Sequence, residues 1–220
     1  REELMTNDVP LPPAPKPASN DALAKARAAM RSELTKRRPA SWTANVAKAS
    51  GTIIGLCVVV AGVMLTIGAC TLDFLSTRAI TLASLITVGV VTTWASLRPQ
   101  GRVGRIASVG LVVLSAVLLV VMRGAGTPSD SPHWVCTVSH FAVGLAPAAV
   151  VIVLLRGMAP NRLRSIVAGL AAGTTGAFVG ELACAKPAGH VAVFHLSAWV
   201  AVALVVTLVS SRLTPRSYAP

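Results

Sequence analysis

The stretch GTIIGLCVVVAGVMLTIGACT, Gly51 to Thr71, decides the fold class, because no residue in it carries a charged side chain. A run of roughly 20 apolar residues is as long as a helix must be to cross the hydrocarbon core of a bilayer. The chain of 220 residues is 54% hydrophobic and only 13% charged, whereas a soluble domain carries about 25% charged residues. The sequence therefore predicts an integral membrane protein.

Five further apolar segments follow, and the connections between them are too short to hold a domain. The predicted spans are 51–71, 79–97, 106–122, 135–155, 165–183 and 191–210. Spans two, three and six read as unbroken, and the middle of the bundle is almost free of charge, which disfavours a transporter. We expect an all-α integral membrane bundle of six transmembrane helices over residues 49–211, with a short tail at 212–220.

The basic residues divide unevenly between the two sides of the membrane. Of the 20 Lys and Arg residues, only Arg78, Arg123 and Lys186 fall on one side; the others flank the bundle or lie in the connections 98–105 and 156–164. Because basic loops stay in the cytoplasm, both termini are expected there, in a multi-pass protein of a bacterial inner membrane. The net charge of +12 is then a topology signal. It predicts no direct nucleic-acid partner, because no aromatic-rich basic face accompanies it.

Residues 1–48 differ from the rest and predict a cytoplasmic segment. VPLPPAPKP, residues 9–17, predicts an extended linker. Helix-capping residues follow, and good helix formers then predict a helix over about 20–38 that Pro39 ends. One face of this helix carries Leu23, Ala26, Met30 and Leu34, with Arg27 and Arg31 beside them. Such a helix either lies on anionic lipid or docks a cytosolic partner, and composition does not choose between the two.

The outer end of the bundle collects most residues with reactive side chains. They are Cys70, Cys136 and Cys184; His133, His140, His190 and His195; and Glu181. Polar groups in a bilayer are costly and face the bundle interior. A disulfide of Cys136 and Cys184, a soft or borderline metal site, and histidines that sense pH or bind haem all fit this set. A position at the membrane–water boundary, with no sensing or binding role, fits as well. The spacing of these residues in the sequence does not identify a metal site.

Other sequence patterns indicate close helix packing, and common catalytic motifs are absent. Gly169-x-x-x-Gly173 and Gly176-x-x-x-Gly180 in the fifth span allow close helix packing. Cys57 lies deeper in the first span and is expected to be a packing residue. No Gly-x-Ser-x-Gly, His-Glu-x-x-His or P-loop pattern is present. The absence of these patterns discounts several classes of enzyme.

The layout and one motif resemble the NrsF-type membrane anti-sigma factors. In both, six short spans follow an N-terminal cytosolic segment, and a Cys opens the fourth span, here Cys136. The clearest motif lies at the start of the last span, and in this chain it consists of Cys184, Pro187, His190, Phe194, His195 and Trp199. The resemblance in layout covers roughly residues 20–212.

The resemblance implies a negative regulator of transcription and not an enzyme, so we expect no catalytic residue and no cofactor. The cytoplasmic segment would hold an extracytoplasmic-function sigma factor, and an oxidant, a metal or light-generated singlet oxygen would release it. Carotenoid synthesis is one output that such regulators control. Cys136 and Cys184 are then the sensing candidates, and Cys70 is a third. A small metal- or haem-handling membrane protein is the alternative, as is a membrane subunit of a larger complex, and self-association of the bundle is left open.

Overall fold

The computed structural model describes residues 20–36, 41–99, 101–123, 126 and 132–213, and of residues 30–36 it describes only the backbone. The predicted Pro-rich linker and Pro39 lie outside the described residues. The helices are α1 (Asn20–Lys36), α2 (Trp42–Thr66), α3 (Leu72–Thr77), α4 (Ala79–Leu97), α5 (Arg102–Val121), α6 (His133–Leu155), α7 (Arg162–Ala183), α8 (Ala188–His190), the π-helical η1 (Val191–His195) and α9 (Leu196–Arg212). The described residues contain no strand, which confirms the predicted all-α fold.

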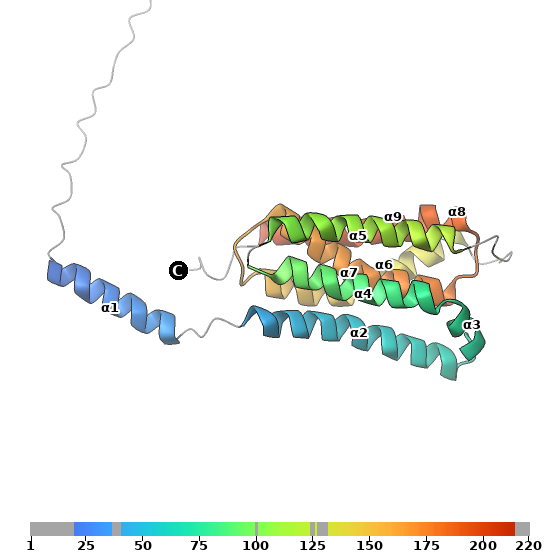
Figure 1. Cartoon of the computed structure of the whole chain (residues 1–220), viewed down its shortest axis with the longest axis horizontal. Helices are drawn as coiled ribbons and strands as arrows, with labels where there is room; N and C mark the ends of the chain where they lie inside the picture. The colour runs from blue at the N-terminus through green and yellow to red at the C-terminus, as the bar shows by residue number, and fades with distance from the viewer. Residues whose placement is uncertain (1–19, 37–40, 100, 124–125, 127–131, 214–220) are drawn as a thin grey trace, which may run out of the picture. The chain divides into compact units, whose positions relative to one another are not determined.

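The predicted number of transmembrane segments is confirmed within the described residues. The helices α2, α4, α5, α6, α7 and the continuous segment Ala188–Arg212 are each long and apolar enough to cross a membrane. They lie side by side in one bundle (Figure 1). The chain divides into two compact units, Arg1–Ala40 and Ser41–Pro220, so α1 is described separately from the bundle.

The first span begins earlier and ends earlier than predicted, for identifiable reasons. The Ser41 side chain accepts a hydrogen bond from the backbone N–H of Ala44 at 3.1 Å and so caps α2 at Trp42. The chain leaves the helix after Thr66 at Gly68, whose φ of 71° suits glycine. Residues 42–48, predicted as part of the cytoplasmic segment, are therefore the start of helix α2.

The short connection after the first span is helical, which the sequence did not predict. Thr71 caps α3 by accepting a hydrogen bond from Phe74 N–H at 3.2 Å, and Asp73 lies in the first turn of this helix. A capping threonine followed by an acidic residue is a helix-start signal. It was overlooked because the segment is short.

The sixth span is continuous, as predicted, but it contains the π turn η1, which the sequence did not predict. The backbone N–H of Leu196 bonds to the carbonyl of Val191, five residues earlier. The hydroxyl of Thr137 on α6 donates to the carbonyl oxygen of Phe194 at 3.1 Å. This bond ties the π turn to α6.

Helix α7 lies at the centre of the bundle and packs against α2, α4, α5, α6 and α9. Its glycines permit close approach, as predicted. A Cβ built on Gly169 would lie 2.6 Å from the Cα atom of Ala203, and one on Gly173 would overlap the indole of Trp199. The indole N–H of Trp199 donates to the carbonyl oxygen of Leu170 at 2.7 Å. Small residues on α7 thus allow α9 to pack directly on its backbone.

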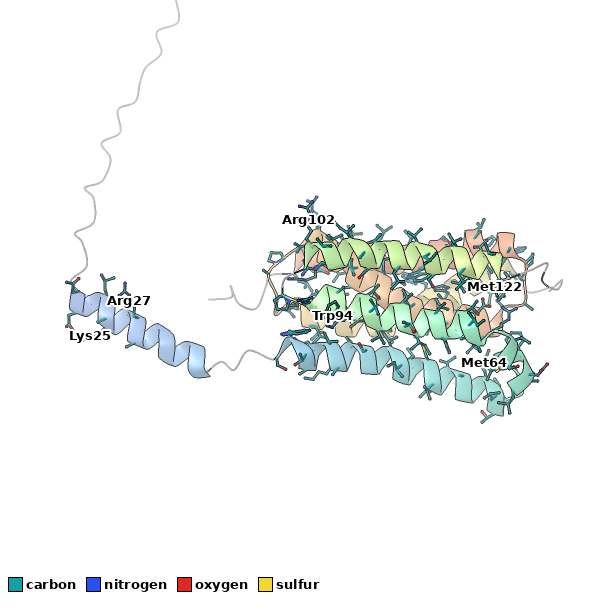
Figure 2. All side chains as sticks on the ribbon, viewed as in Figure 1. Lys25, Arg27, Met64, Trp94, Arg102 and Met122 are labelled. Atoms are coloured by element: carbon teal, nitrogen blue, oxygen red, sulfur yellow. The ribbon has the colours of Figure 1, made fainter. Side chains whose placement is uncertain are left out.

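The surface of the bundle carries exposed apolar side chains, among them Val58, Val113, Leu114, Val117 and Leu204. Such a surface suits lipid contact. We call the end of the bundle that holds Cys136, Cys184 and His190 the Cys/His end, and Figure 2 shows Met64 and Met122 there. The opposite end, which we call the basic end, holds the labelled Trp94 and Arg102 (Figure 2).

Buried arginines stabilise the basic end by binding carbonyl groups. Arg105 donates to the carbonyl oxygen of Arg98 at 2.7 Å, and Arg164 donates to those of Ala159 and Pro99 at 2.8 and 3.1 Å. Carbonyls at helix ends lack intrahelical partners, and basic side chains commonly supply them. These bonds hold the connections after α4 and α6 against the bundle.

Candidate functional site

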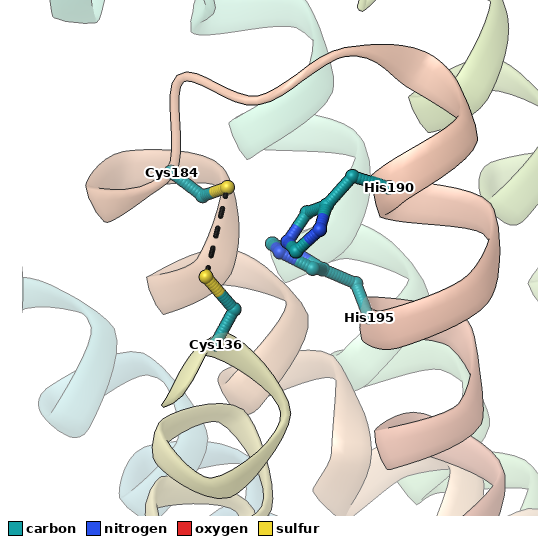
Figure 3. Close-up of side chains that lie close together, drawn as sticks. All are labelled: Cys136, Cys184, His190 and His195. Carbon is teal, nitrogen blue, oxygen red and sulfur yellow. Dashed lines mark hydrogen bonds between the residues drawn. The ribbon is translucent and has the colours of Figure 1, made fainter. Parts of the chain in front are cut away.

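Two cysteines from different helices meet at the Cys/His end. Cys136 lies in the first turn of α6, and Cys184 is the residue at which α7 ends. Their Sγ atoms are 3.9 Å apart (Figure 3). Cys184 is buried and Cys136 is partly exposed. The fold thus brings together two thiols that the sequence places 48 residues apart.

The four histidines of the predicted outer cluster also come together, as a row of neighbouring rings. The Nδ1 atoms of His133 and His190 are 2.8 Å apart, within hydrogen-bond distance. The ring centroids of His190 and His195 are 5.3 Å apart, and those of His195 and His140 are 5.7 Å apart. The row therefore begins at the start of α6, crosses α8 and η1, and ends at His140 inside the bundle.

The inner imidazoles are buried among helices. His140, His190 and His195 are at most 5% exposed. Their Nε2 atoms are buried, and none has a hydrogen-bond partner in the described part of the chain. Gly176 and Gly180 on α7 make room for these rings, since a Cβ at either position would overlap His140 or His195.

Glu181 belongs to a group of ion pairs beside the cysteines. Among the described residues, none of its hydrogen bonds or ion pairs involves a histidine of the row. Its carboxylate pairs with Arg78 through one oxygen and with Arg123 Nη1 through the other, the latter at 2.7 Å. Arg123 also donates from Nε to the carbonyl oxygen of Lys186 at 2.9 Å. The group thus joins α4, α5 and α7 and holds the loop that follows Cys184.

These ion pairs were not predicted, because Arg78 and Arg123 were interpreted only as topology signals. An acidic residue one turn inside a span must find a cationic partner or remain neutral. The two basic residues at the same end were therefore the available partners. Their pairing with Glu181 could have been predicted from this rule.

The remaining cysteines lie elsewhere. Cys57 is part of the apolar core with Ile53 and Leu85, which confirms its predicted packing role. Cys70, the third sensing candidate, is buried. Within the described residues, the group whose ligand atoms lie close together consists of Cys136, Cys184, His190 and His195 and does not include Cys70.

Comparison with known proteins now identifies the family. Residues 28–214 match the family NrsF, described as "Negative regulator of sigma F". The chain belongs to this family. The "Carotenogenesis protein CarR" of Myxococcus xanthus is 45% identical to it over 203 residues, which cover 91% of this chain and 92% of that protein. No solved structure matches the chain. The resemblance predicted from Cys136 and the motif Cys184–Trp199 is thereby confirmed.

The match to the NrsF family begins inside α1, which carries the predicted docking residues. Leu23 is 42% exposed, and Ala26 and Arg27 are exposed. The side chains of Met30, Arg31 and Leu34 lie outside the described residues. Asp21 and Lys25 form an exposed ion pair at 3.4 Å, which contributes little stability in water.

The basic end of the NrsF-family bundle contains a cavity of about 370 Å³ between α6, α7 and α9. Arg156, Arg162 and Arg164 line it together with apolar side chains such as Leu155 and Leu213. Basic pockets between transmembrane helices suit anionic headgroups. The sequence analysis predicted basic residues at this end but not a cavity, which depends on how three helices pack.

Proposed function

We propose that this NrsF-family chain holds an extracytoplasmic-function sigma factor at the bacterial inner membrane and releases it when a signal changes the Cys/His end. The family match carries the proposal, because a negative regulator of a sigma factor needs a surface that captures it. The family is regulatory, so we assign no catalytic residue and no direct nucleic-acid contact.

The distribution of basic residues supports an orientation with both termini in the cytoplasm. Apart from Arg78, Arg123 and Lys186, the Lys and Arg residues lie before α2, after α9 or at the basic end. Positively charged loops remain on the cytoplasmic side. In this orientation α1 faces the compartment of the sigma factor, and the Cys/His end faces outward.

We place the sigma-binding surface on α1, on the face formed by Leu23, Ala26, Arg27, Met30, Arg31 and Leu34. An amphipathic helix can bind a partner by laying its apolar face into a groove. The basic residues would speed association with an acidic surface of the sigma factor. Helix α1 ends at Lys36 and α2 begins at Trp42, so few residues separate the two helices. A movement of the first span would therefore be transmitted to α1 through a short connection.

Replacing Leu23 with aspartate is expected to weaken capture of the sigma factor at least about tenfold, because each loss of 1.4 kcal/mol is tenfold in affinity. The variant puts a charge on the proposed apolar face. Co-purification of the full chain with the sigma factors of the source cell measures the effect.

Ala28→Asp is the matched control, because it introduces the same charge on the far side of α1, where the side chain is also exposed. Its capture is expected to stay close to that of the unmodified chain. Equal losses in both variants, or none in either, would argue against this face as the docking surface.

We place the signal input at Cys136 and Cys184. Their closeness at the Cys/His end supports this, since a change in either thiol acts on both α6 and α7. An oxidant, a metal ion or light-generated singlet oxygen is the proposed class of signal, and carotenoid synthesis is the proposed output. The family match disfavours metal or haem handling as the function of the whole protein. Anionic lipid at the basic cavity is a proposed further contact, and self-association stays open.

A further inference from the structure

Four potential metal ligands converge at the Cys/His end from three separate segments. They are Cys136 of α6, Cys184 at the end of α7, and His190 and His195 of the last span. Each offers one ligand atom, and these atoms all lie within 4.8 Å of one another. Figure 3 shows the four side chains directed toward a common point between the helices. We propose that they form a binding site for a borderline-soft divalent cation of the zinc type.

The spacing of the sulfur atoms fits shared coordination. Two sulfurs bound at about 2.3 Å to a tetrahedral zinc ion lie roughly 3.8 Å apart. The Sγ atoms of Cys136 and Cys184 are 3.9 Å apart. The thiols thus need little movement to bind one ion.

The histidines supply buried nitrogen atoms that lack other partners. The Nε2 atoms of His190 and His195 are buried, and neither has a hydrogen-bond partner among the described residues. A buried polar atom left without a partner costs about 1–3 kcal/mol. A bound cation would remove this cost, because neutral imidazole nitrogen is a preferred zinc ligand.

A neighbouring histidine orients one of these ligands. The Nδ1 atoms of His133 and His190 lie 2.8 Å apart. Histidines that bind metals usually donate their other N–H to a nearby acceptor, which fixes the tautomer. Donation from His190 Nδ1 to His133 leaves His190 Nε2 as a lone-pair donor. We therefore assign His133 as a positioning residue.

The π turn explains how two histidines five residues apart serve one site. Residues i and i+5 are linked by a hydrogen bond in a π turn, whereas they diverge on a regular α-helix. Residues 191–195 form this turn, and the rings of His190 and His195 lie 5.3 Å apart at their centroids. π turns often occur at functional sites, and here the turn gathers the two imidazoles.

The charges near the group favour a zinc-like ion over calcium or magnesium. Calcium and magnesium prefer oxygen ligands, but the nearby carboxylate of Glu181 is paired with Arg78 and Arg123. Thiolate and imidazole select softer ions. Two thiolates also neutralise a divalent cation, which lowers the cost of placing it among buried helices. Arg123 holds the loop after Cys184 through the carbonyl of Lys186 and so keeps that ligand in place.

Zinc binding by the full chain tests the proposal. The reduced protein in lipid nanodiscs is loaded with Zn²⁺, freed of excess ion and assayed for metal by mass spectrometry. We expect about one zinc ion per chain, as a four-ligand site requires. Loss of a positioning partner weakens metal binding roughly 10–100-fold, so His133→Ala should weaken zinc binding by an amount in that range. Cys136→Ser and His195→Ala each remove a ligand, so each should weaken zinc binding by more.

The matched control is Cys70→Ser, which removes a buried thiol outside the group and should leave zinc binding unchanged. A second measurement uses the unmodified chain, in which Zn²⁺ should protect Cys136 and Cys184 from alkylation but not Cys70. Absence of bound zinc in the reduced chain, or binding that survives both ligand substitutions, would overturn the proposal.

The role of this site as a signal input rests on the proposed function, whereas zinc binding itself does not require a sigma factor. Sigma-factor capture is therefore measured on the same chain in its reduced, zinc-free form. A chain that binds added zinc but captures no sigma factor in the zinc-free form would refute the proposed function and leave the site intact. Capture without zinc binding would refute the site alone.

Discussion

Replacing Glu181 with alanine is expected to destabilise the bundle by about 3–5 kcal/mol, the cost of leaving a buried charge without its partner. Glu181 and Arg123 are 3% and 6% exposed, and the carboxylate bridges Arg123 and Arg78. The substitution leaves the Arg123 guanidinium buried without its carboxylate. Titration of the full chain in mixed micelles with a denaturing detergent measures the free energy of unfolding.

Asp73→Ala is the control, because it removes an exposed carboxylate at the same end of the bundle. Asp73 lies in the first turn of α3, where a carboxylate contributes about 0.3–1 kcal/mol through the helix dipole. The loss in this variant should therefore stay below about 1 kcal/mol. Equal losses for Asp73→Ala and Glu181→Ala would mean that the ion pairs do not stabilise this end.

Replacing Gly176 with alanine is expected to lower stability by about 1–3 kcal/mol, through overpacking between α6 and α7. A Cβ at this position would overlap the carbonyl oxygen and the imidazole of His140. Because a carbonyl belongs to the helix backbone, α6 itself must move. The same detergent titration measures the loss.

Gly110→Ala is the matched control, since it makes the same change in the transmembrane helix α5. A Cβ there meets no described heavy atom within 4 Å. Alanine is a better helix former than glycine by about 0.8–1.0 kcal/mol, so this variant should gain stability. Stabilisation by both substitutions would contradict the close contact of α6 with Gly176.

The apolar spans could be predicted because each is read from composition alone. The segment 79–97 coincides with α4. The first span differs most, since α2 begins at Trp42 and not at residue 51, and the remaining spans differ from the helices by a few residues at their ends. The ends depend on capping residues such as Ser41, which hydropathy does not register. The π turn at Val191–His195 could not be predicted, because the helical template assumes bonds four residues apart.

The members of the candidate site could be predicted, but their contacts could not. Cys136, Cys184, His190 and His195 were selected because topology places them at one end of the bundle. Their convergence depends on the order in which α6, α7 and α9 pack around one another, and nothing in the local sequence specifies this order. The exposed face of α1 was read from helical periodicity, and its binding role remains a prediction.

The location of the sigma factor in fractionated cells tests the central claim most directly. Cells would make either the full chain or a chain that lacks residues 20–36, with bundle levels in the membrane checked for both. The account predicts that the sigma factor sediments with membranes that contain the full chain and is soluble when α1 is removed. A sigma factor that stays soluble beside the full chain, or stays on the membrane without α1, would contradict it.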